Sequence, residues 1–230
     1  MHYKIHSLLY RKDIVTAIQL FKELRYLIDA LPCWVEKKNN WLIAHPSRKI
    51  IALNGHDFSE EALAYVDYLI ANQKTISMVL ADENEDDSII TILYKNTPSI
   101  SIERYLLTVT IKSLSGHNNM DDFIYIFTAM VNYKGWRFKY ILLDTEQYRF
   151  NQREVFEDRL PVGWMLYLPV KIKHEDVPSA YKIFDIESNT GTIVVSKSVF
   201  NGKEPFDIAC ANNVEIELAA KGLLPLIKGL

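Results

Sequence analysis

Cysteine, glycine and proline are scarce in this sequence, which has two cysteines, eight glycines and eight prolines in 230 residues. Cys33 and Cys210 lie far apart and form no C-x-x-C pair, so the sequence provides neither a disulfide framework nor a zinc knuckle. We expect buried thiols in a reducing compartment, although the spacing leaves a single bridge between them open. No internal repeat, low-complexity tract or Pro/Gly/Ser-rich linker divides the chain.

Long hydrophobic runs are also absent. No segment continues for about 18 apolar residues without a charge, and the N-terminal residues show no basic region followed by an uninterrupted apolar one. We therefore expect a cytoplasmic protein with no membrane partner. The formal net charge of −3 gives no general basic field, which disfavours direct nucleic-acid binding and tolerates a basic partner better than an acidic one.

Apolar residues make up 49% of the chain, which is enough to bury a substantial core at this length. Helical and strand-like segments are interspersed without a regular βαβ alternation. The sequence predicts an α+β fold: a single domain over residues 1–230, with a mixed, largely antiparallel sheet flanked by about four helices. Two lobes with a boundary near residues 75–90 are the alternative arrangement.

Four segments have the pattern of helices. The first is expected to have Asp13 as its N-cap and to end before Pro32. Its apolar residues recur at steps of three and four: Ile14, Ile18, Phe21, Leu24, Ile28 and Leu31. Ser59 is expected to cap a second helix and Asn119 a third, each with two acidic residues in its first turn. Residues 207–227 are ambiguous between strand and helix, and we favour a helix.

The segments predicted to be strands are rich in β-branched residues and leucine. Residues 76–81, 88–94 and 104–113 are expected to form an antiparallel meander, and residues 179–188 and 191–200 a hairpin joined through Asn189–Gly191. Further strands are expected at residues 3–10, 137–144 and 163–172.

Catalytic motifs are missing from the sequence: it contains no GxxxxGK[ST], GxGxxG, HExxH, GxSxG or EF-hand loop. His117 with Asp121 and Asp122 is the best metal-like group, because an imidazole and two carboxylates can converge on one ion. The competing explanation is that both acids occupy the first turn of a helix, where its dipole favours them. A weaker nuclease-like pattern consists of Glu36-x-Lys38 with Asp29 upstream. The other histidines are scattered over different elements: His2, His6, His45, His56 and His174.

The largest block of charge is acidic and contains five carboxylates: Asp82, Glu83, Glu85, Asp86 and Asp87. Such a run repels itself and is expected to form a solvated loop between two strands. A sharper hypothesis is that these acids form a negative surface that steers a basic protein partner into place.

Three ordered blocks near the C-terminus carry a family resemblance. They are V-G-W-M-x-Y-L-P at residues 162–169, G-T-I-V-V at 191–195, and A-N-x-V-E-I-x-L with G-L-L-P at 211–225. In these blocks the chain resembles the bacterial immunity protein 52 family. The likeness covers roughly the last third of the chain closely, whereas the first two thirds agree only in the order of elements.

This resemblance implies an immunity protein that binds and neutralises a cognate toxin of interbacterial competition, in particular a restriction-endonuclease-like nuclease. The implied mechanism is occlusion of the toxin's active or substrate-binding site, without catalysis, cofactor or metal. Binding would involve the acidic run. The motif residues are expected to serve mainly packing: Gly163, Trp164, Tyr167, Leu168 and Pro169. A metal-dependent hydrolase using His117, Asp121 and Asp122, and a toxin-accessory scaffold, remain the alternative functions.

Overall fold

The computed structural model describes residues 1–11, 15–32, 40–45, 47–54, 57–73, 76–82, 88–97, 101–113, 118–186 and 191–230. The strands are β1 (His2–Tyr10), β2 (Asn40–Ile43), β3 (Ile50–Asn54), β4 (Asp57–Phe58), β5 (Ser77–Asp82), β6 (Ser88–Thr97), β7 (Ser101–Ser113), β8 (Arg137–Thr145), β9 (Met165–Leu168), β10 (Lys182–Ile186) and β11 (Gly191–Val195). The α-helices are α1 (Ala17–Asp29), α2 (Glu60–Tyr68), α3 (Met120–Asn132) and α4 (Pro205–Ala220), with a π-helical turn at Leu69–Gln73 and a 3₁₀ turn at Ile227–Gly229.

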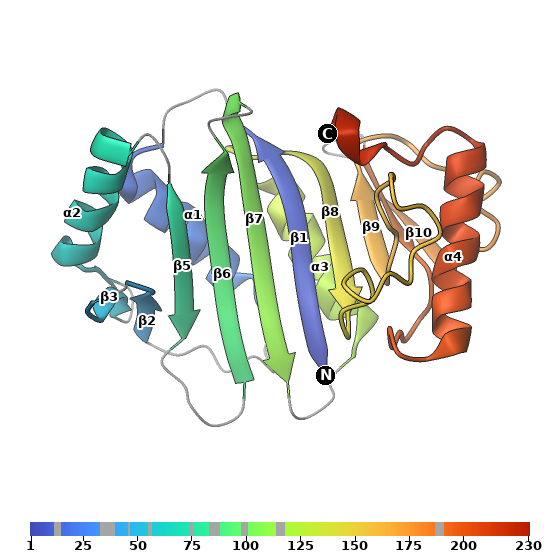
Figure 1. The fold of residues 1–230 in the computed structure, drawn as a ribbon, viewed down its shortest axis with the longest axis horizontal. Helices are drawn as coiled ribbons and strands as arrows, with labels where there is room; N and C mark the ends of the chain where they lie inside the picture. The colour runs from blue at the N-terminus through green and yellow to red at the C-terminus, as the bar shows by residue number, and fades with distance from the viewer. Residues whose placement is uncertain are drawn as a thin grey trace.

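All eleven strands belong to one sheet, in the order β10-β11-β9-β8-β1-β7-β6-β5-β2-β3-β4 (Figure 1). The pairings between neighbouring strands are antiparallel. The expected α+β domain with a largely antiparallel sheet and four helices is thereby confirmed, as are the meander β5-β6-β7 and the paired strands β10 and β11. Because β5 and β6 pair with each other, the sheet is continuous across the boundary proposed for the two-lobe alternative.

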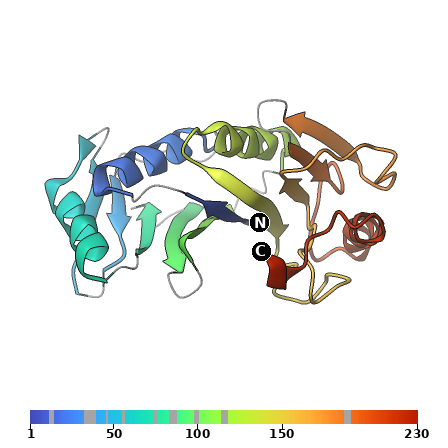
Figure 2. The same cartoon turned by 90° about the horizontal axis from the view of Figure 1, so that it is seen from above.

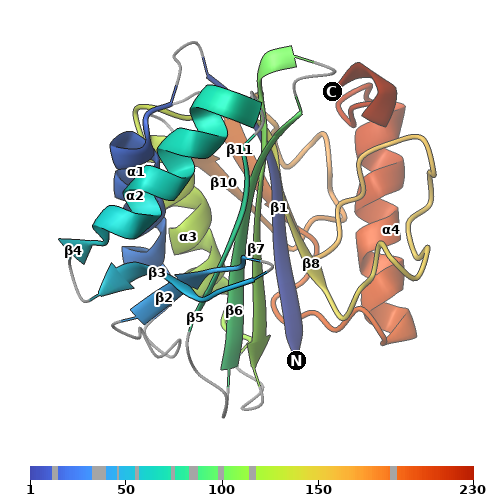
Figure 3. The ribbon, with the colours of Figure 1, turned by 60° about the vertical axis from the view of Figure 1, so that its left-hand side comes forward.

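Helices α1, α2 and α3 cover one face of the sheet, and α4 lies on the opposite face (Figures 2 and 3). The alternation of side chains along each strand matches this arrangement. In β1, Tyr3, Ile5 and Leu9 join the larger core beneath α1 and α3. Leu8 points the other way and joins a smaller core with Val214 of α4.

The first helix differs from its predicted start. Its N-cap is Thr16, whose side chain accepts a hydrogen bond from the Gln19 N–H at 3.2 Å, rather than Asp13. Ile18 is 52% exposed, so its predicted burial is wrong. An α-helix turns by about 100° per residue, which places Ile18 outside the buried face of α1. That face is centred on Leu24 and also contains Leu20, Phe21, Leu27 and Ile28.

The other helix predictions are confirmed. Ser59 caps α2 by accepting from the Ala62 N–H at 3.0 Å, and Asn119 caps α3 by accepting from the Asp121 N–H at 3.1 Å. The favoured helix near the C-terminus is α4, in which Val214 and Leu218 are buried against the smaller core.

A glycine turn leads into strand β9 at the position of the VGWM block. Gly163 has a φ of 56°, and a Cβ atom there would lie 2.9 Å from the Leu143 carbonyl oxygen. An L side chain is therefore disfavoured by both conformation and space. The turn directs Trp164 into the larger core, where it is fully buried and donates from Nε1 to the Lys197 carbonyl oxygen at 2.8 Å.

Candidate functional site

One face of the central strands is left open, because α4 covers only the part of that face that lies nearer to β8–β11 (Figure 2). On β5, β6 and β7 the side chains that alternate with the buried ones are half-buried or exposed there: Ser77, Val79, Ala81, Thr91, Leu93, Lys95, Arg104, Leu106, Thr108, Thr110 and Lys112. We call this surface, together with His2, Lys4 and His6 of β1, the open sheet face. The side chains described on these four strands give it cations and apolar groups but no carboxylate.

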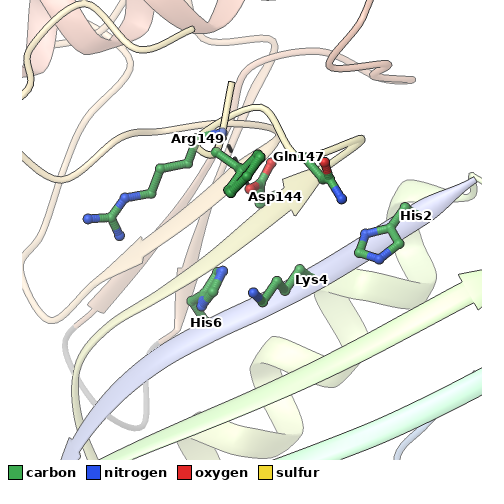
Figure 4. A pocket seen from close by; sticks show the side chains of 7 residues that line it. His2, Lys4, His6, Asp144, Gln147 and Arg149 are labelled. Carbon is green, nitrogen blue, oxygen red and sulfur yellow. Dashed lines mark hydrogen bonds between the residues drawn. The ribbon is translucent and has the colours of Figure 1, made fainter. Parts of the chain in front are cut away.

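A pocket of about 380 Å³ lies where the open sheet face meets the turn after β8 (Figure 4). It is lined by His2, Lys4, His6, Asp144, Gln147, Arg149 and Phe150. Three of these residues alternate along β1, while the others come from the end of β8 and the turn that follows. Strand pairing brings the two groups together, since Lys4 lies opposite Asp144 and His6 opposite Leu142 in the β1–β8 register. We call this cavity the β1–β8 pocket.

The turn after β8 has an unusual backbone. Glu146, Gln147 and Gln152 have φ values of 49°, 60° and 53°, in the left-handed region that residues other than glycine, asparagine and aspartate rarely adopt. Strain of this kind persists only where surrounding contacts enforce it, and it concentrates at functional sites.

Contacts to β1 and α4 hold this turn in place. The Glu146 N–H donates to the His2 carbonyl oxygen at 2.9 Å, and the Glu146 carboxylate accepts from the His2 N–H at 3.0 Å. Tyr148 is buried, and its hydroxyl donates to Glu215 Oε1 of α4 at 3.1 Å. The turn is therefore fixed at both sides, and it positions Arg149 and Phe150 at the rim of the pocket, where Phe150 is 81% exposed.

Asp144 is the most unusual group in the pocket. It is only 4% exposed, and its Oδ1 atom has no hydrogen-bond partner among the described residues. Its Oδ2 atom accepts a long hydrogen bond, 3.4 Å from the Arg149 N–H. Burial disfavours the charged form and outweighs the backbone N–H groups of Arg149 and Tyr148 and the nearby Lys4, so it raises the pKa of Asp144 to about 6.

Burial also changes the pKa values of the histidines around Asp144. Desolvation, with Lys4 and Arg149 nearby, lowers the pKa of His6 to about 4, so His6 is neutral at neutral pH. Desolvation also lowers the pKa of His2. Neither the Lys4 ammonium nor the Arg149 guanidinium forms an ion pair with a described residue within 4.0 Å. The pocket thus combines two cations, two histidines whose pKa values are lowered, and one buried carboxylate.

Most of the residues predicted to bind a toxin lie outside the described residues. Glu83, Glu85, Asp86 and Asp87 lie outside the described residues, and of Asp82 only the backbone is placed, at the end of β5. The run connects β5 to β6, as expected of a loop between two strands. The β1–β8 pocket belongs to a different part of the sheet, because β7 and β1 intervene between β6 and β8.

The residues of the VGWM block lie away from the open sheet face. Trp164 and Tyr167 are buried in the larger core, Leu168 is buried in the smaller core, and Pro169 is exposed just after β9. Gly191 belongs to the same packing arrangement, since a Cβ atom there would lie 2.3 Å from the Tyr167 ring. The G-T-I-V-V block therefore contacts the VGWM block through the Tyr167 side chain.

Among the described residues, the two groups that were predicted to bind a metal show no arrangement that would hold one. Asp121 and Asp122 lie in the first turn of α3, where the helix dipole accounts for them, and His117 lies outside the described residues. Asp29 ends α1 and pairs with Arg25 at 3.1 Å, while Glu36 and Lys38 are not described. Within the described ranges, no three His, Cys, Asp or Glu residues are grouped to hold a metal ion. Cys210 is a free, half-buried thiol, and Cys33 is not described.

Sequence reasoning missed the β1–β8 pocket. His2 and His6 look scattered in the sequence, and Asp144 looks like the end of an apolar strand. The alternation of His2, Lys4 and His6 was a local signal that one side of β1 is polar. Their convergence with Asp144 depends on the pairing of β1 with β8, which are far apart in the chain, and no local pattern reports it.

Comparisons with known proteins establish a shared fold. No family model matches the chain, and no curated protein sequence matches it significantly. Among solved structures, the chain is similar to the Pseudomonas aeruginosa T6SS protein PA0821, with a TM-score of 0.57 and 10% sequence identity over 95% of this chain and 76% of that chain. At this identity the similarity shows the fold alone. None of the described helices is long and apolar enough to cross a membrane.

Proposed function

We propose that this chain is an immunity protein of the type VI secretion system, which neutralises a cognate nuclease toxin by binding to it. The observation that carries the proposal is the fold shared over 95% of the chain with a T6SS protein. The resemblance of residues 162–169, 191–195 and 211–225 to immunity protein 52 points to the same biology from the sequence. In this proposal the chain performs no catalysis and uses no cofactor.

The inhibitory mechanism would be occlusion. A nuclease toxin has a positively charged cleft that attracts the phosphates of its substrate, and an acidic surface competes for that cleft. Asp82, Glu83, Glu85, Asp86 and Asp87 form the densest acidic segment of the sequence. We assign them to the rim of the interface, where opposite charge speeds association and excludes the substrate.

The open sheet face carries positive charge, opposite in sign to the acidic segment, and its lysines provide a control for the assigned interface. Lys95 and Lys112 are exposed cations on β6 and β7, so they repel a basic toxin if it approaches this face. Lys112 lies opposite Ile89, next to the acidic segment, whereas Lys95 lies opposite Ser77, at the other end of β5 from Asp82. A toxin guided by the acidic segment should therefore be insensitive to Lys95, which lies farther from that segment than a Debye length of about 8 Å at physiological salt.

A toxin gene is expected beside this one, and co-expression of the two genes tests the proposal directly. We expect survival of cells that produce the toxin, and co-elution of the two purified proteins as a stoichiometric complex. Survival without complex formation would indicate an indirect role, and failure of both would refute the proposed function.

Kinetics of association test the assigned surface. Neutralising all five acids, by Asp→Asn and Glu→Gln substitutions, should lower the association rate constant at low salt by about tenfold or more and flatten its dependence on ionic strength. Lys95→Gln serves as the matched control and should leave the rate unchanged. If instead Lys95→Gln raises the rate and the acid variant leaves it unchanged, the basic toxin approaches the open sheet face, where this lysine repels it.

A further inference from the structure

The open sheet face has apolar side chains at its centre and no helix over it. Figure 1 shows β5, β6, β7 and β1 in front of α1 and α3, with no described helix on the side that faces the viewer. Strand register places Leu93 opposite both Val79 and Thr108, and Leu106 opposite Leu8. Val79, Leu93 and Leu106 are half-buried, so a partner that covers the face would remove further apolar surface from water.

Four cations lie at the two ends of this apolar centre. At one end, Lys4 of β1 lies diagonally across from Lys112 of β7. At the other end, Arg104 of β7 lies diagonally across from Lys95 of β6. None of the four forms an ion pair with a residue that the structure describes. Positive charge at both ends favours a partner whose carboxylates have a matching separation.

The chemistry of the face selects among classes of partner. A second copy docked face to face would bring like charges together, which disfavours association. A nucleic acid would supply phosphates, but proteins that bind single strands also stack the bases on aromatic rings. The side chains described on the open side of β5, β6 and β7 include no aromatic ring. An acidic protein surface with apolar groups between its carboxylates matches both the charge and the apolar centre.

The geometry of the face suits an α-helix. Both edges of β6 and of β7 are paired within the sheet, so this face offers no backbone hydrogen bonds to an extended strand. A helix satisfies its own backbone groups and is about 10–12 Å wide, whereas the four strands span about 14 Å at roughly 4.8 Å between neighbours. The distance from Arg104 to Lys112 along β7 is about 26 Å at roughly 3.3 Å per residue, which is the length of about 17 helical residues.

We propose that the open sheet face binds an acidic amphipathic α-helix of a partner protein. The apolar stripe of this helix packs against Val79, Leu93 and Leu106, and carboxylates near its two ends pair with the four cations. The bound helix extends the layer that α4 forms on the same side of the sheet (Figure 3). This interaction is separate from the proposed toxin interface, which uses the acidic segment.

A synthetic peptide of about 18 residues, held helical by a side-chain staple, serves as the probe. It has leucines along one stripe and glutamates in its first and last turns, and a matched peptide has lysine in place of each glutamate. In fluorescence anisotropy titrations with the purified chain, we expect the acidic peptide to bind at least about tenfold more tightly than the lysine peptide. Equal affinities, or no binding of the acidic peptide, would overturn the proposal.

Substitutions on the two sides of the sheet locate the bound peptide. Lys95→Glu with Lys112→Glu should weaken binding of the acidic peptide by about tenfold or more, and Leu93→Ala should weaken it by about fivefold. Lys22→Glu with Lys134→Glu makes the same change in net charge at exposed lysines on the helical side of the molecule and should leave the affinity unchanged. Equal weakening by both lysine pairs would show an effect of net charge alone and refute the site.

The same variants identify the other possible occupants. If polyuridylate RNA binds the parent chain but not the Lys95→Glu, Lys112→Glu variant, while the acidic peptide binds neither, the face serves a nucleic acid and the proposal fails. Sedimentation velocity of the parent chain tests a second copy as the occupant. A dimer that this variant dissociates would assign the face to self-association and also overturn the proposal. Because none of these measurements contains the toxin, helix binding and toxin neutralisation can fail independently.

Discussion

Asp144 lies on a strand that is covered over most of its length, and its carboxylate has lost most of its water without gaining full hydrogen bonding. Burial raises its pKa from 3.8 to about 6. The native state therefore holds this proton more tightly than the unfolded chain does. The resulting contribution to the free energy of unfolding is present in full below pH 3.8 and is lost as the pH rises through about 6.

Replacing this carboxyl should therefore stabilise the protein in a pH-dependent way. We expect Asp144→Asn to raise the free energy of unfolding by about 1–3 kcal/mol at about pH 7.5 and to change it little at about pH 4. Urea unfolding at the two pH values measures the difference. Asp158→Asn, at an exposed carboxyl, is the control and should show no such dependence. A neutral-pH loss of stability in Asp144→Asn would mean that the carboxylate is better compensated than its contacts indicate.

Trp164 is the residue of the VGWM block whose replacement should cost the most. Its side chain is 0% exposed and packs against Phe123, with ring centroids 5.2 Å apart. Trp164→Ala should lower the free energy of unfolding by about 3–5 kcal/mol through the cavity that it leaves. Phe150→Ala, at an 81% exposed aromatic residue, should change it by less than about 0.5 kcal/mol. Thermal or urea unfolding measures both, and equal effects would contradict the core assignment.

At the residue scale, the sequence predicted single positions well where local rules decide them. Ser59 and Asn119 act as caps because a side-chain oxygen satisfies a nearby N–H, which depends only on a few neighbours. The sequence predicted Asp13 as the N-cap of α1, but the helix begins after Thr16, three residues later. Asp144 could not be recognised, because its burial comes from strand β1 and from the turn that folds back over it.

At the scale of elements, the turn after β8 and helix α4 form one polar unit. Glu215 of α4 is 1% exposed and accepts hydrogen bonds from the Val155 N–H at 2.9 Å and the Val162 N–H at 3.0 Å. It also accepts from Tyr148 within the turn. A single buried carboxylate thus anchors the segment between β8 and β9 to the helix that covers it.

Removing this anchor should release the segment and weaken the fold. Glu215→Ala leaves two backbone donors and a tyrosine hydroxyl without their acceptor, and we expect a loss of about 2–5 kcal/mol. Amide hydrogen exchange should increase first in residues 146–162. Glu217→Ala on the same helix, whose partner Ser179 is exposed, should cost less than about 1 kcal/mol. Uniform exchange across the whole sheet would show instead that the anchor supports global stability only.

The elements themselves were largely predictable. The strands are rich in β-branched residues and bounded by polar clusters, and the helices carry caps and apolar stripes, so local patterns indicate both. The order of the strands was not predictable, because β1 inserts between β7 and β8 and thereby separates strands that are neighbours in sequence around α3. The location of the pocket depends on that insertion.

At the scale of the whole molecule, the continuity of the sheet governs how the protein unfolds. The strands on both sides of residues 83–87 pair with each other from Ser77–Lys95 to Ala81–Thr91, and the larger core includes residues of both. We expect a single cooperative transition, observed as coincident urea curves from tryptophan fluorescence and far-ultraviolet circular dichroism. Two separated transitions would support two lobes with a boundary near residues 75–90.

The central position of β1 also affects the order of events during synthesis. Tyr3 pairs with both Ile111 and Thr145, so β1 has no neighbouring strand until β7 has been synthesised and no second neighbour until β8 has been synthesised. Contacts that span so much sequence close slowly, and an unpaired strand in the meantime is prone to associate with other chains. Nascent chains of this protein should therefore be clients of chaperones that shield the N-terminal segment until β7 and β8 emerge.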